Sequence, residues 1–169
     1  MRIISGKFKG RSIEYLSNLN TRPLKDSVRE NIFNILSHSK KIKVEIENSN
    51  ILDLYSGIGS FGIESISRGA KKVTFVDQDT IASNILKNNL TKLSINSEAS
   101  IVNDKIENFL NKPFKDKYNI FFFDPPFADM KFAYNLELIK KVLHFQSYNN
   151  LNNNNTKILV NSLPENTLI

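Results

Sequence analysis

One stretch of the chain, residues 119–127, limits the possible folds more than any other. It reads Asn-Ile-Phe-Phe-Phe-Asp-Pro-Pro-Phe. An uninterrupted apolar run of this length, ended by two prolines, is typical of a strand that is buried on both faces of a parallel sheet. Open α/β sheets bind ligands at the carboxyl ends of their strands, so Asp124 would stand at a binding edge. The alternative is that Asp-Pro-Pro is only a rigid turn that ends the strand.

From residue 50 onward the chain alternates short apolar runs with segments of helical periodicity, which predicts a doubly wound α/β fold with a parallel sheet. The expected strands are residues 51–54, 72–76, 100–103, 119–123 and 157–160. Gly69 is placed to end the first helix of this region, and Asp79 to begin the second. A low-complexity loop at 149–155 precedes the last strand.

A glycine-rich loop follows the first of these strands. Residues 57–62 have the spacing Gly-x-Gly-x-x-Gly between a strand and a helix, as a nucleotide-binding fingerprint requires. Glycines there let a ligand approach the backbone closely, and the helix N-terminus offers free N–H groups. Asp77 lies eighteen positions after Gly59, where a carboxylate would meet ribose hydroxyls. A plain tight turn is the alternative.

Two cofactors fit this pattern. A nicotinamide dinucleotide would put a pyrophosphate over the loop, whereas S-adenosylmethionine brings a sulfonium cation and an ammonium group. Asp53, just before the loop, would repel the first and attract the second, by roughly 1 to 4 kcal/mol at about 4 Å depending on exposure. We therefore expect S-adenosylmethionine. Asp104, at the end of the third strand, would accept a hydrogen bond from the adenine amine, or it would instead cap a helix.

Composition excludes several kinds of site. The 169 residues are 40% hydrophobic, which suits one globular domain with a small appendage. The absence of cysteine excludes disulfides, thiolate metal sites and cysteine nucleophiles, and with two histidines we expect no metal. No apolar run of the sequence is long enough to span a membrane and no signal-peptide pattern opens it, so we expect a cytoplasmic protein without a membrane partner.

Positive charge is concentrated near the N-terminus. Residues 1–29 contain seven Lys or Arg and two acidic residues, a net +5 out of the chain's +6. Such an excess at one end favours an arm that binds a polyanion; the alternative is a charged terminus that only keeps the chain soluble. We expect a basic hairpin, with strands at 2–4 and 12–15 around a turn at 6–10.

A helix is expected to follow the arm. Asp26 or the serine after it can cap the helix. The expected apolar face has helical spacing and consists of Val28, Ile32, Phe33, Ile35 and Leu36. Arg29 projects elsewhere, toward a ligand or solvent. A polar connector at 40–49 then favours a division into residues 1–45, the arm with its helix, and residues 46–169, the cofactor-binding domain.

The Asp-Pro-Pro-Phe sequence at 124–127 fits methyl transfer to an exocyclic base amine. Such an amine is a poor nucleophile, because its lone pair is delocalised into the ring. Asp124 and the Pro125 carbonyl would accept its hydrogens and direct the nitrogen at the methyl group. The two prolines hold the backbone rigid, and Phe127 offers a stacking face for a base that has left its helix.

Several blocks of the sequence together resemble the RNA small-subunit methyltransferase D family. The blocks are residues 2–11, 21–23, 26–36, 53–59, 64–70 and 124–127, and the similarity runs in order from Arg2 to about Val160. Members of that family use S-adenosylmethionine to methylate the N2 amine of a guanine in bacterial small-subunit ribosomal RNA. The resemblance implies a Rossmann-like class I methyltransferase fold, with ribosomal RNA or the small-subunit particle as partner. We further expect a monomer.

The resemblance also assigns roles to single residues. Catalysis falls to Asp124, Pro125, Pro126 and Phe127. Donor binding falls to Asp53, Tyr55, Gly57, Gly59, Asp77 and Asp104. RNA binding falls to Arg2, Lys7, Lys9, Arg11, Arg22 and Arg29. The arm that carries these basic residues would also form a lid over the cofactor.

The sequence departs from the family pattern at three places. Asp77 stands where the family more often has Glu, and Asn161 where it usually has Glu. The family continues after the last strand into a β-hairpin that completes the sheet, whereas this sequence stops at Ile169. The final hairpin is therefore expected to be missing, which would leave the strand at 157–160 as an exposed edge.

Three other functions stay open at this point. The first is an adenine-amine methyltransferase of DNA or RNA, because the Asp-Pro-Pro-aromatic motif serves several exocyclic amines. The second is an oxidoreductase that binds a nicotinamide dinucleotide at the glycine loop. The third is an inactive relative that keeps the basic arm and binds RNA without modifying it.

Overall fold

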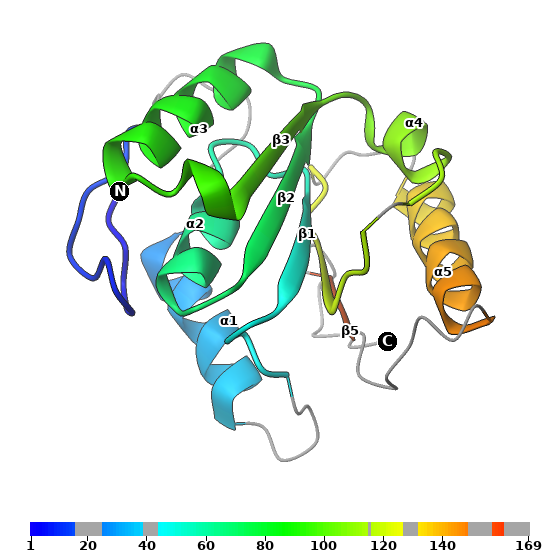
Figure 1. Ribbon diagram of the computed structural model, residues 1–169, viewed down its shortest axis with the longest axis horizontal. Helices are drawn as coiled ribbons and strands as arrows, with labels where there is room; N and C mark the ends of the chain where they lie inside the picture. Colours follow the sequence, from blue (N-terminus) through cyan, green and yellow to red (C-terminus); the bar gives the residue numbers. More distant parts are fainter. Residues whose placement is uncertain (16–24, 39–43, 115, 127–131, 149–156, 161–169) are drawn as a thin grey trace.

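The computed structural model describes residues 1–15, 25–38, 44–114, 116–126, 132–148 and 157–160 (Figure 1). Its helices are α1 (Asp26–His38), α2 (Ser60–Ser67), α3 (Thr80–Leu93), the short 3-10 helix η1 (Asn96–Glu98), α4 (Ile106–Leu110) and α5 (Phe132–Tyr148). Its strands are β1 (Asn50–Leu54), β2 (Lys72–Asp77), β3 (Ala99–Asn103), β4 (Ile120–Phe123) and β5 (Lys157–Val160). Each of the five strands predicted from residue 50 onward is confirmed, with its ends within one residue of the expected positions.

The strands form one parallel sheet in the order β3-β2-β1-β4-β5. The chain proceeds outward from β1 through β2 to β3, and then returns to place β4 on the other side of β1. This reversal between β1 and β4 is the topological switch point at which such sheets bind ligands. The doubly wound α/β prediction is confirmed, as is the prediction that β4 is a neighbour of β1. In the described sheet β5 is an edge strand.

Helices cover both faces of the sheet (Figure 1). The residues of α1, α2 and α3 share a hydrophobic core with Ile51, Phe75 and Phe122. The residues of α4 and α5 share a second core, on the opposite face, with Leu54 and Phe123. Alternate residues of β1 and β4 thus enter different layers, which is why both strands read as continuous apolar runs.

Local signals in the sequence set the start of α3 and the end of α2. Asp79 caps α3, and its carboxylate accepts hydrogen bonds from the backbone N–H groups of Ile81 (2.8 Å) and Ala82 (3.1 Å). Gly69, with φ +97°, follows the last turn of α2 in the left-handed conformation that ends many helices. Both predicted ends are confirmed.

The predicted apolar face of α1 is wrong in part. Arg29, Phe33 and Leu36 are buried, whereas Val28 and Ile35 are 37% and 43% exposed. The difference arises because Arg29 is buried with ionic partners. The spacing of apolar residues alone would leave an arginine at this position in solvent. Phe33 stacks on the aromatic ring of α2, with ring centroids 5.1 Å apart, and this contact fixes α1 to the sheet domain.

The arm is a loop that lies against the helices. Its predicted strands at 2–4 and 12–15 reduce to a single antiparallel bridge between Arg2 and Ser12. Three apolar side chains of the arm enter the core on the α2 face: Ile3, Phe8 and Ile13. The described part of the arm therefore packs directly on the larger domain. The division into residues 1–45 and 46–169 stays a prediction.

Some predicted features lie outside the described residues. They are the contacts of Arg22 and Phe127, the loop at 149–155 and the substitution at Asn161. The polar connector expected at 40–49 is described only from residue 44 onward, and Ile46 within it is buried in the core on the α2 face.

Candidate active site

Three adjacent strands end together and gather acidic side chains at the carboxyl edge of the sheet. β1 is in register with β2 and with β4 up to its last residue, Leu54. Tyr55, Asp77 and Asp124 follow at one level of this edge. Asp53, one residue inside β1, lies close enough to the two other carboxylates that both raise its pKa. Three predicted site carboxylates thus meet at the switch point.

Asp77 fastens the glycine loop to the end of β2. One carboxylate oxygen accepts a hydrogen bond from the backbone N–H of Gly57 (2.7 Å), and the other accepts from the backbone N–H of Asp79 (2.8 Å). A carboxylate has about four acceptor positions, so these two bonds leave capacity for ribose hydroxyls. Asp77 is half-buried, and its two hydrogen bonds position the glycine loop.

Asp53 is buried beneath the loop, with 1% of its surface exposed. Its carboxylate accepts a hydrogen bond from the backbone N–H of Gly62 (3.0 Å). Burial raises the pKa of Asp53 well above its ordinary value; the charges of Asp124 and Asp77 raise it further, and the Gly62 bond opposes them. From its position in the sequence, Asp53 is expected to be an anion that faces the ligand. The structure places it as a buried acid that ties α2 to β1.

Each glycine of the loop has its own structural reason. Gly57 has φ +52°, and a Cβ there would meet nothing within 4 Å. Gly59 has φ +80°, and a Cβ would come within 2.4 Å of the Leu86 side chain. At Gly62 a Cβ would come within 2.2 Å of the Phe75 ring, so this glycine lets α2 pack closely on β2. Of the three, Gly57 is the one that leaves room for a ligand.

The N–H groups of these glycines are already engaged within the protein. Gly57 donates to Asp77, Gly62 donates to Asp53, and Gly59 donates to the backbone carbonyl of the serine at position 56 (2.8 Å). A pyrophosphate-binding loop needs such groups free for phosphate oxygens. This loop presents carboxylates at the same place, which suits a cationic ligand.

Asp104 lies beyond the end of β3, where its carboxylate has three partners. One oxygen accepts from the backbone N–H of Lys105 (2.8 Å) and the side-chain amide of Asn108 (3.0 Å), and the other from the Lys112 ammonium (2.6 Å). These bonds lower the pKa of Asp104 to about 2, and the bond from Lys112 has the largest effect. No side chain caps α4, so the helix-capping alternative is wrong. Adenine binding by Asp104 stays a prediction.

The Asp-Pro-Pro motif continues β4 beyond the paired part of the sheet. The backbone N–H of Asp124 points at the Leu54 carbonyl (3.5 Å). Asp124 is half-buried, Pro125 is buried and Pro126 is exposed. Asp124 therefore stands beside the strand that leads into the glycine loop, with part of its side chain accessible, as an acceptor for a docked base must be.

Two polar residues next to the loop escaped the sequence analysis. Asn135, in the first turn of α5, is completely buried, and its side-chain amide donates to the Tyr55 hydroxyl (2.9 Å). Ser56 is buried, and its hydroxyl has no hydrogen-bond partner. The sequence does contain a signal for Asn135, because its spacing from Leu138 and Val142 places the three side chains on one face of a helix. All three are buried in the structure.

Four basic residues of the arm are exposed, as RNA contact requires: Arg2, Lys7, Lys9 and Arg11. The Lys7 ammonium lies 5.3 Å from the centre of the Phe8 ring, and the Arg11 guanidinium carbon lies 5.7 Å from it. The ring thus holds two cations near each other on the surface. RNA binding by these four residues stays a prediction.

Arg29 is not a surface residue, so the prediction that it contacts RNA is wrong. Its side chain is 1% exposed, and it forms an ion pair with Asp26 (2.9 Å), with Glu64 at 3.7 Å. It also donates to the backbone carbonyl of Arg2. Burial lowers the pKa of Arg29, and the charges of Glu64 and Asp26 oppose that shift. The residue holds α1, α2 and the arm together, because a buried cation needs anionic partners.

Glu64 of α2 is an anchor for the arm. It is 1% exposed, and its carboxylate accepts hydrogen bonds from the backbone N–H groups of Ile4 (2.8 Å) and Ser5 (2.9 Å) and from the Arg68 guanidinium (2.9 Å). Gly6 permits the close approach, since a Cβ there would come within 1.9 Å of a carbonyl oxygen of α2. The arm therefore has a defined place on the helix that begins at the glycine loop.

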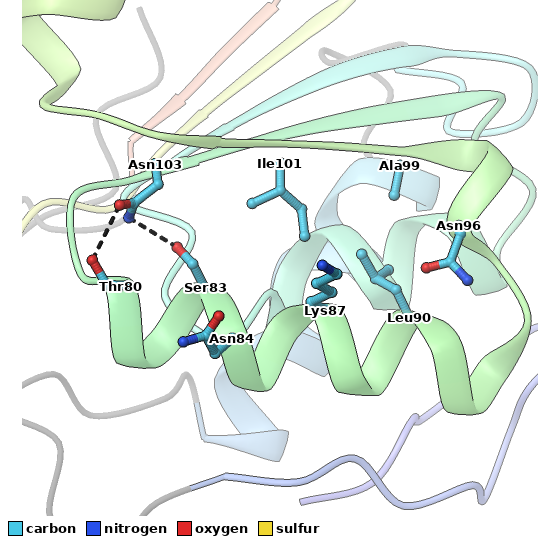
Figure 2. Close-up of a pocket in the computed structure, with 9 residues that line it drawn as sticks. All are labelled: Thr80, Ser83, Asn84, Lys87, Leu90, Asn96, Ala99, Ile101 and Asn103. Atoms are coloured by element: carbon cyan, nitrogen blue, oxygen red, sulfur yellow. Dashed lines mark hydrogen bonds between the residues drawn. The ribbon is translucent and has the colours of Figure 1, made fainter.

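A separate hollow lies between α3 and β3 (Figure 2). Its volume is about 410 Å³, and both polar and apolar side chains line it. Asn103 contacts Thr80 (3.1 Å) and Ser83 (3.2 Å) at one end of it, as Figure 2 shows. None of the predicted site residues lines this hollow, so it is distinct from the carboxyl-edge site.

Two searches of the described residues bear on metals and membranes. No helix in that part of the chain is long and apolar enough to cross a membrane. The same residues contain no group of three or more His, Cys, Asp or Glu side chains that could hold a metal ion. The expectations of a metal-free, monomeric, cytoplasmic protein stay predictions.

Sequence comparison identifies close relatives. The family described as Conserved hypothetical protein 95 matches residues 1–168. Ribosomal RNA small subunit methyltransferase D of Haemophilus influenzae is 40% identical over 129 residues, which are 75% of this chain and 64% of the relative. Its namesake from Buchnera aphidicola subsp. Baizongia pistaciae is 37% identical over 168 residues, 99% of this chain and 78% of the relative. The chain thus spans less than two thirds of the Haemophilus relative.

Solved structures agree with the fold. The protein yhhF of Escherichia coli, a proposed methyltransferase, has a TM-score of 0.74 at 28% identity, with 99% of this chain and 85% of that one covered. HI0767 of Haemophilus influenzae, a proposed methylase, has a TM-score of 0.67 at 33% identity. The match covers 99% of this chain and 84% of HI0767. The Rossmann-like methyltransferase fold is confirmed. This chain belongs to the Conserved hypothetical protein 95 family, that of ribosomal RNA small-subunit methyltransferase D, as its sequence blocks predicted.

Proposed function

We propose that this chain transfers a methyl group from S-adenosylmethionine to the exocyclic N2 amine of a guanine in small-subunit ribosomal RNA. The observation that carries the proposal is the place of Asp124, beside a glycine loop whose N–H groups are held by carboxylates. Relatives named as ribosomal RNA methyltransferases support the reaction and the class of substrate. The choice of guanine N2 rests on the resemblance of the Asp-Pro-Pro-Phe motif and the arm.

The loop residues fit S-adenosylmethionine better than a dinucleotide. The donor carries a sulfonium and an ammonium, and when bound it supplies an electrophilic methyl group. The charges of Asp124 and Asp77 contribute to the raised pKa of Asp53, and a cationic ligand would relieve that repulsion. Gly57 leaves space for close approach of a ligand. Asp77 keeps acceptor capacity for the ribose.

Asp124 and Pro125 would prepare the acceptor amine. The Asp124 carboxylate and the Pro125 carbonyl would each accept a hydrogen bond from the amine. These two bonds would oppose delocalisation of the nitrogen lone pair and direct it at the methyl group. When bound, the donor would supply the methyl group to this nitrogen with its sulfur as the leaving group, and the methylated nitrogen would give up one proton. Asp124 would accept that proton or pass it to water.

The arm would bring the RNA to this edge. Its exposed cations suit phosphates, which supply much of the affinity of nucleic-acid complexes. Because Glu64 fixes the arm on α2, phosphates bound there stand at a defined place relative to the glycine loop. Residues 1–45 would thus contact RNA and partly cover the cofactor.

Labelled methyl transfer tests the function. Free ribosomal RNA and small-subunit particles, both from a strain without this enzyme, are incubated with the chain and labelled donor, and the modified base is mapped. We expect one N2-methylguanine, lost in Asp124→Ala and kept in the exposed control Asp116→Ala. A methylated adenine would replace guanine in the proposal. No transfer, together with tight binding of a nicotinamide dinucleotide, would reject it.

A further inference from the structure

A contact between the glycine loop and α5 goes beyond the groups assigned above. Asn135 has no exposed surface, and its amide donates to the Tyr55 hydroxyl (2.9 Å). The two residues are 80 positions apart in the sequence. Tyr55 lies in the loop that would bind the donor, and Asn135 in the first turn of the helix that follows the Asp-Pro-Pro segment.

The backbone of Tyr55 needs support. Its φ is +60°, a left-handed conformation that bulky residues rarely adopt. Such conformations persist where surrounding contacts fix them, and they gather at functional sites. Two contacts of the side chain do so here: the hydrogen bond from Asn135, and the packing of the ring on Phe123, with ring centroids 5.7 Å apart.

These contacts hold both ends of the Asp-Pro-Pro segment. Phe123 immediately precedes Asp124, and Asn135 lies just inside α5, which begins at Phe132. The Tyr55 side chain touches one residue on each side of the segment. It therefore fixes the end of β4 and the start of α5 relative to the glycine loop.

The polarity of Asn135 is not explained by packing. The residue shares a buried stripe with leucine and valine side chains, and its Oδ1 atom is buried without a hydrogen-bond partner. Buried polar atoms are nearly always paired, and an apolar residue of similar volume would avoid this cost. An asparagine at this position gains only the bond to Tyr55, which points to a role for that bond.

We propose that Asn135 is a positioning residue for methyl transfer: through Tyr55 it keeps the glycine loop and the Asp-Pro-Pro segment at the spacing that the reaction needs. The inference rests on the proposed function. Spacing matters because a displacement of about 1 Å at the reacting atoms can cost roughly 100-fold in rate. Donor binding depends on Gly57 and Asp77, whose hydrogen bonds do not involve Asn135. The rate of transfer should therefore respond more than donor affinity.

Single-turnover methyl transfer to ribosomal RNA tests this in Asn135→Leu, Tyr55→Phe and the double variant, at a temperature well below each Tm. Donor Kd is measured by calorimetry in the same samples. We expect each single change to lower the rate constant about tenfold or more, and the double change to add little, because both remove one contact. Donor Kd should stay within about threefold in Asn135→Leu, because Asn135 lies on α5 and not in the glycine loop. Asn135→Asp should recover much of the rate, since a carboxyl group can share a hydrogen bond with the Tyr55 hydroxyl in either protonation state.

The exposed residue Asn88 on α3 provides the control, and Asn88→Leu should transfer methyl like the wild type. Should Asn135→Leu fail to fold, Tyr55→Phe and Asn135→Asp still carry the test. A rate for the single variants within twofold of wild type overturns the positioning role, as do losses that multiply in the double variant. A wild-type chain that binds the donor yet transfers no methyl overturns the proposed function, and this inference with it.

Discussion

Asp53 lies inside β1 and Asp104 just after β3 of the same sheet, yet their pKa values shift in opposite directions. Burial raises the pKa of Asp53, whereas three hydrogen bonds lower that of Asp104 to about 2. At physiological pH Asp104 is thus a fixed anion, already engaged with Lys112. Asp53 is an acid whose ionisation costs stability until a cation comes near.

The pH dependence of stability should report the burial of Asp53. A carboxyl whose pKa is raised by folding stabilises the fold relatively at low pH, and that contribution is lost as pH rises through the folded pKa. Asp53→Asn keeps an oxygen for the Gly62 N–H and cannot ionise. We expect the variant to match wild type near pH 4, around the ordinary pKa of aspartate, and to be more stable at pH 8.

Urea unfolding at the two pH values measures this difference. Each unit of pKa shift corresponds to about 1.4 kcal/mol of unfolding free energy. The exposed residue Asp116 provides a control, because Asp116→Asn should show no such pH-dependent gain. An Asp53→Asn chain that is less stable than wild type at pH 8 would contradict the raised pKa.

Asp77 has a structural role at the glycine loop and a proposed role in ligand binding, and two substitutions separate them. Asp77→Ala removes the acceptors of two backbone N–H groups, those of Gly57 and Asp79. We expect donor affinity to fall by about 1 to 3 kcal/mol, roughly 5- to 150-fold in Kd. Asp77→Asn keeps one acceptor oxygen and should lose less. Calorimetry with S-adenosylmethionine decides, and an unchanged Kd in Asp77→Ala would remove Asp77 from the donor site.

At the scale of elements, α2 joins the two halves of the proposed function. Its first turn lies under the glycine loop, where Gly62 bonds Asp53, and its next turn carries Glu64 and the arm. A helix is rigid over this distance. The position of the arm is therefore set by the same element that shapes the donor site.

Neutralising Glu64 should loosen the arm and lower stability. Glu64→Gln keeps the shape of the side chain but leaves Arg29 buried with fewer anionic partners. Removing one partner of a buried ion pair costs about 3 to 5 kcal/mol, and we expect a loss of that order in urea unfolding, together with a raised KM for RNA. Glu137→Gln breaks an exposed pair with Lys140 on α5 and serves as the control; it should have little effect. Equal effects of the two substitutions would refute the anchoring role of Glu64.

Strands and helices that follow a hydrophobic pattern in the sequence were predictable. Polar contacts between residues far apart in the sequence were not. The sequences of β1 and β4 are continuous apolar runs because helices cover both faces of the sheet. Asp79 begins α3 by local hydrogen bonds, and Gly69 ends α2 by its left-handed conformation. The sequence also placed three carboxylates at the carboxyl edge. Burial of Arg29 depends on partners 3 to 35 residues away, and no local pattern encodes such pairing. Asn135 likewise has its partner 80 residues away.

Over the whole molecule, charge of opposite sign is separated between the arm and the strand ends. The arm lies on the α2 and α3 side of the sheet (Figure 1). Asn89 of α3 exchanges two hydrogen bonds with the backbone of Glu14. Its cations suit RNA phosphates, while the acidic carboxyl edge suits a cationic donor and a base amine. In the proposed reaction, the arm would attract the RNA phosphates and the carboxyl edge would attract the cationic donor.

The salt dependence of RNA binding should change when the arm loses its charge. Lys7, Lys9 and Arg11 are exposed, and replacing all three with Gln removes three candidate phosphate contacts. Each contact contributes about 0.7 to 0.9 to the slope of log K against log salt, so we expect the slope to fall by roughly 2 and donor Kd to stay unchanged. Replacing Lys117, Lys140 and Lys141 with Gln removes the same charge from exposed positions outside the arm. That control should keep the wild-type slope, because the slope depends on the number of direct phosphate contacts and not on the net charge of the whole molecule. Equal slopes for the two triple variants would mean that RNA responds to the total charge of the molecule and that the arm has no privileged role.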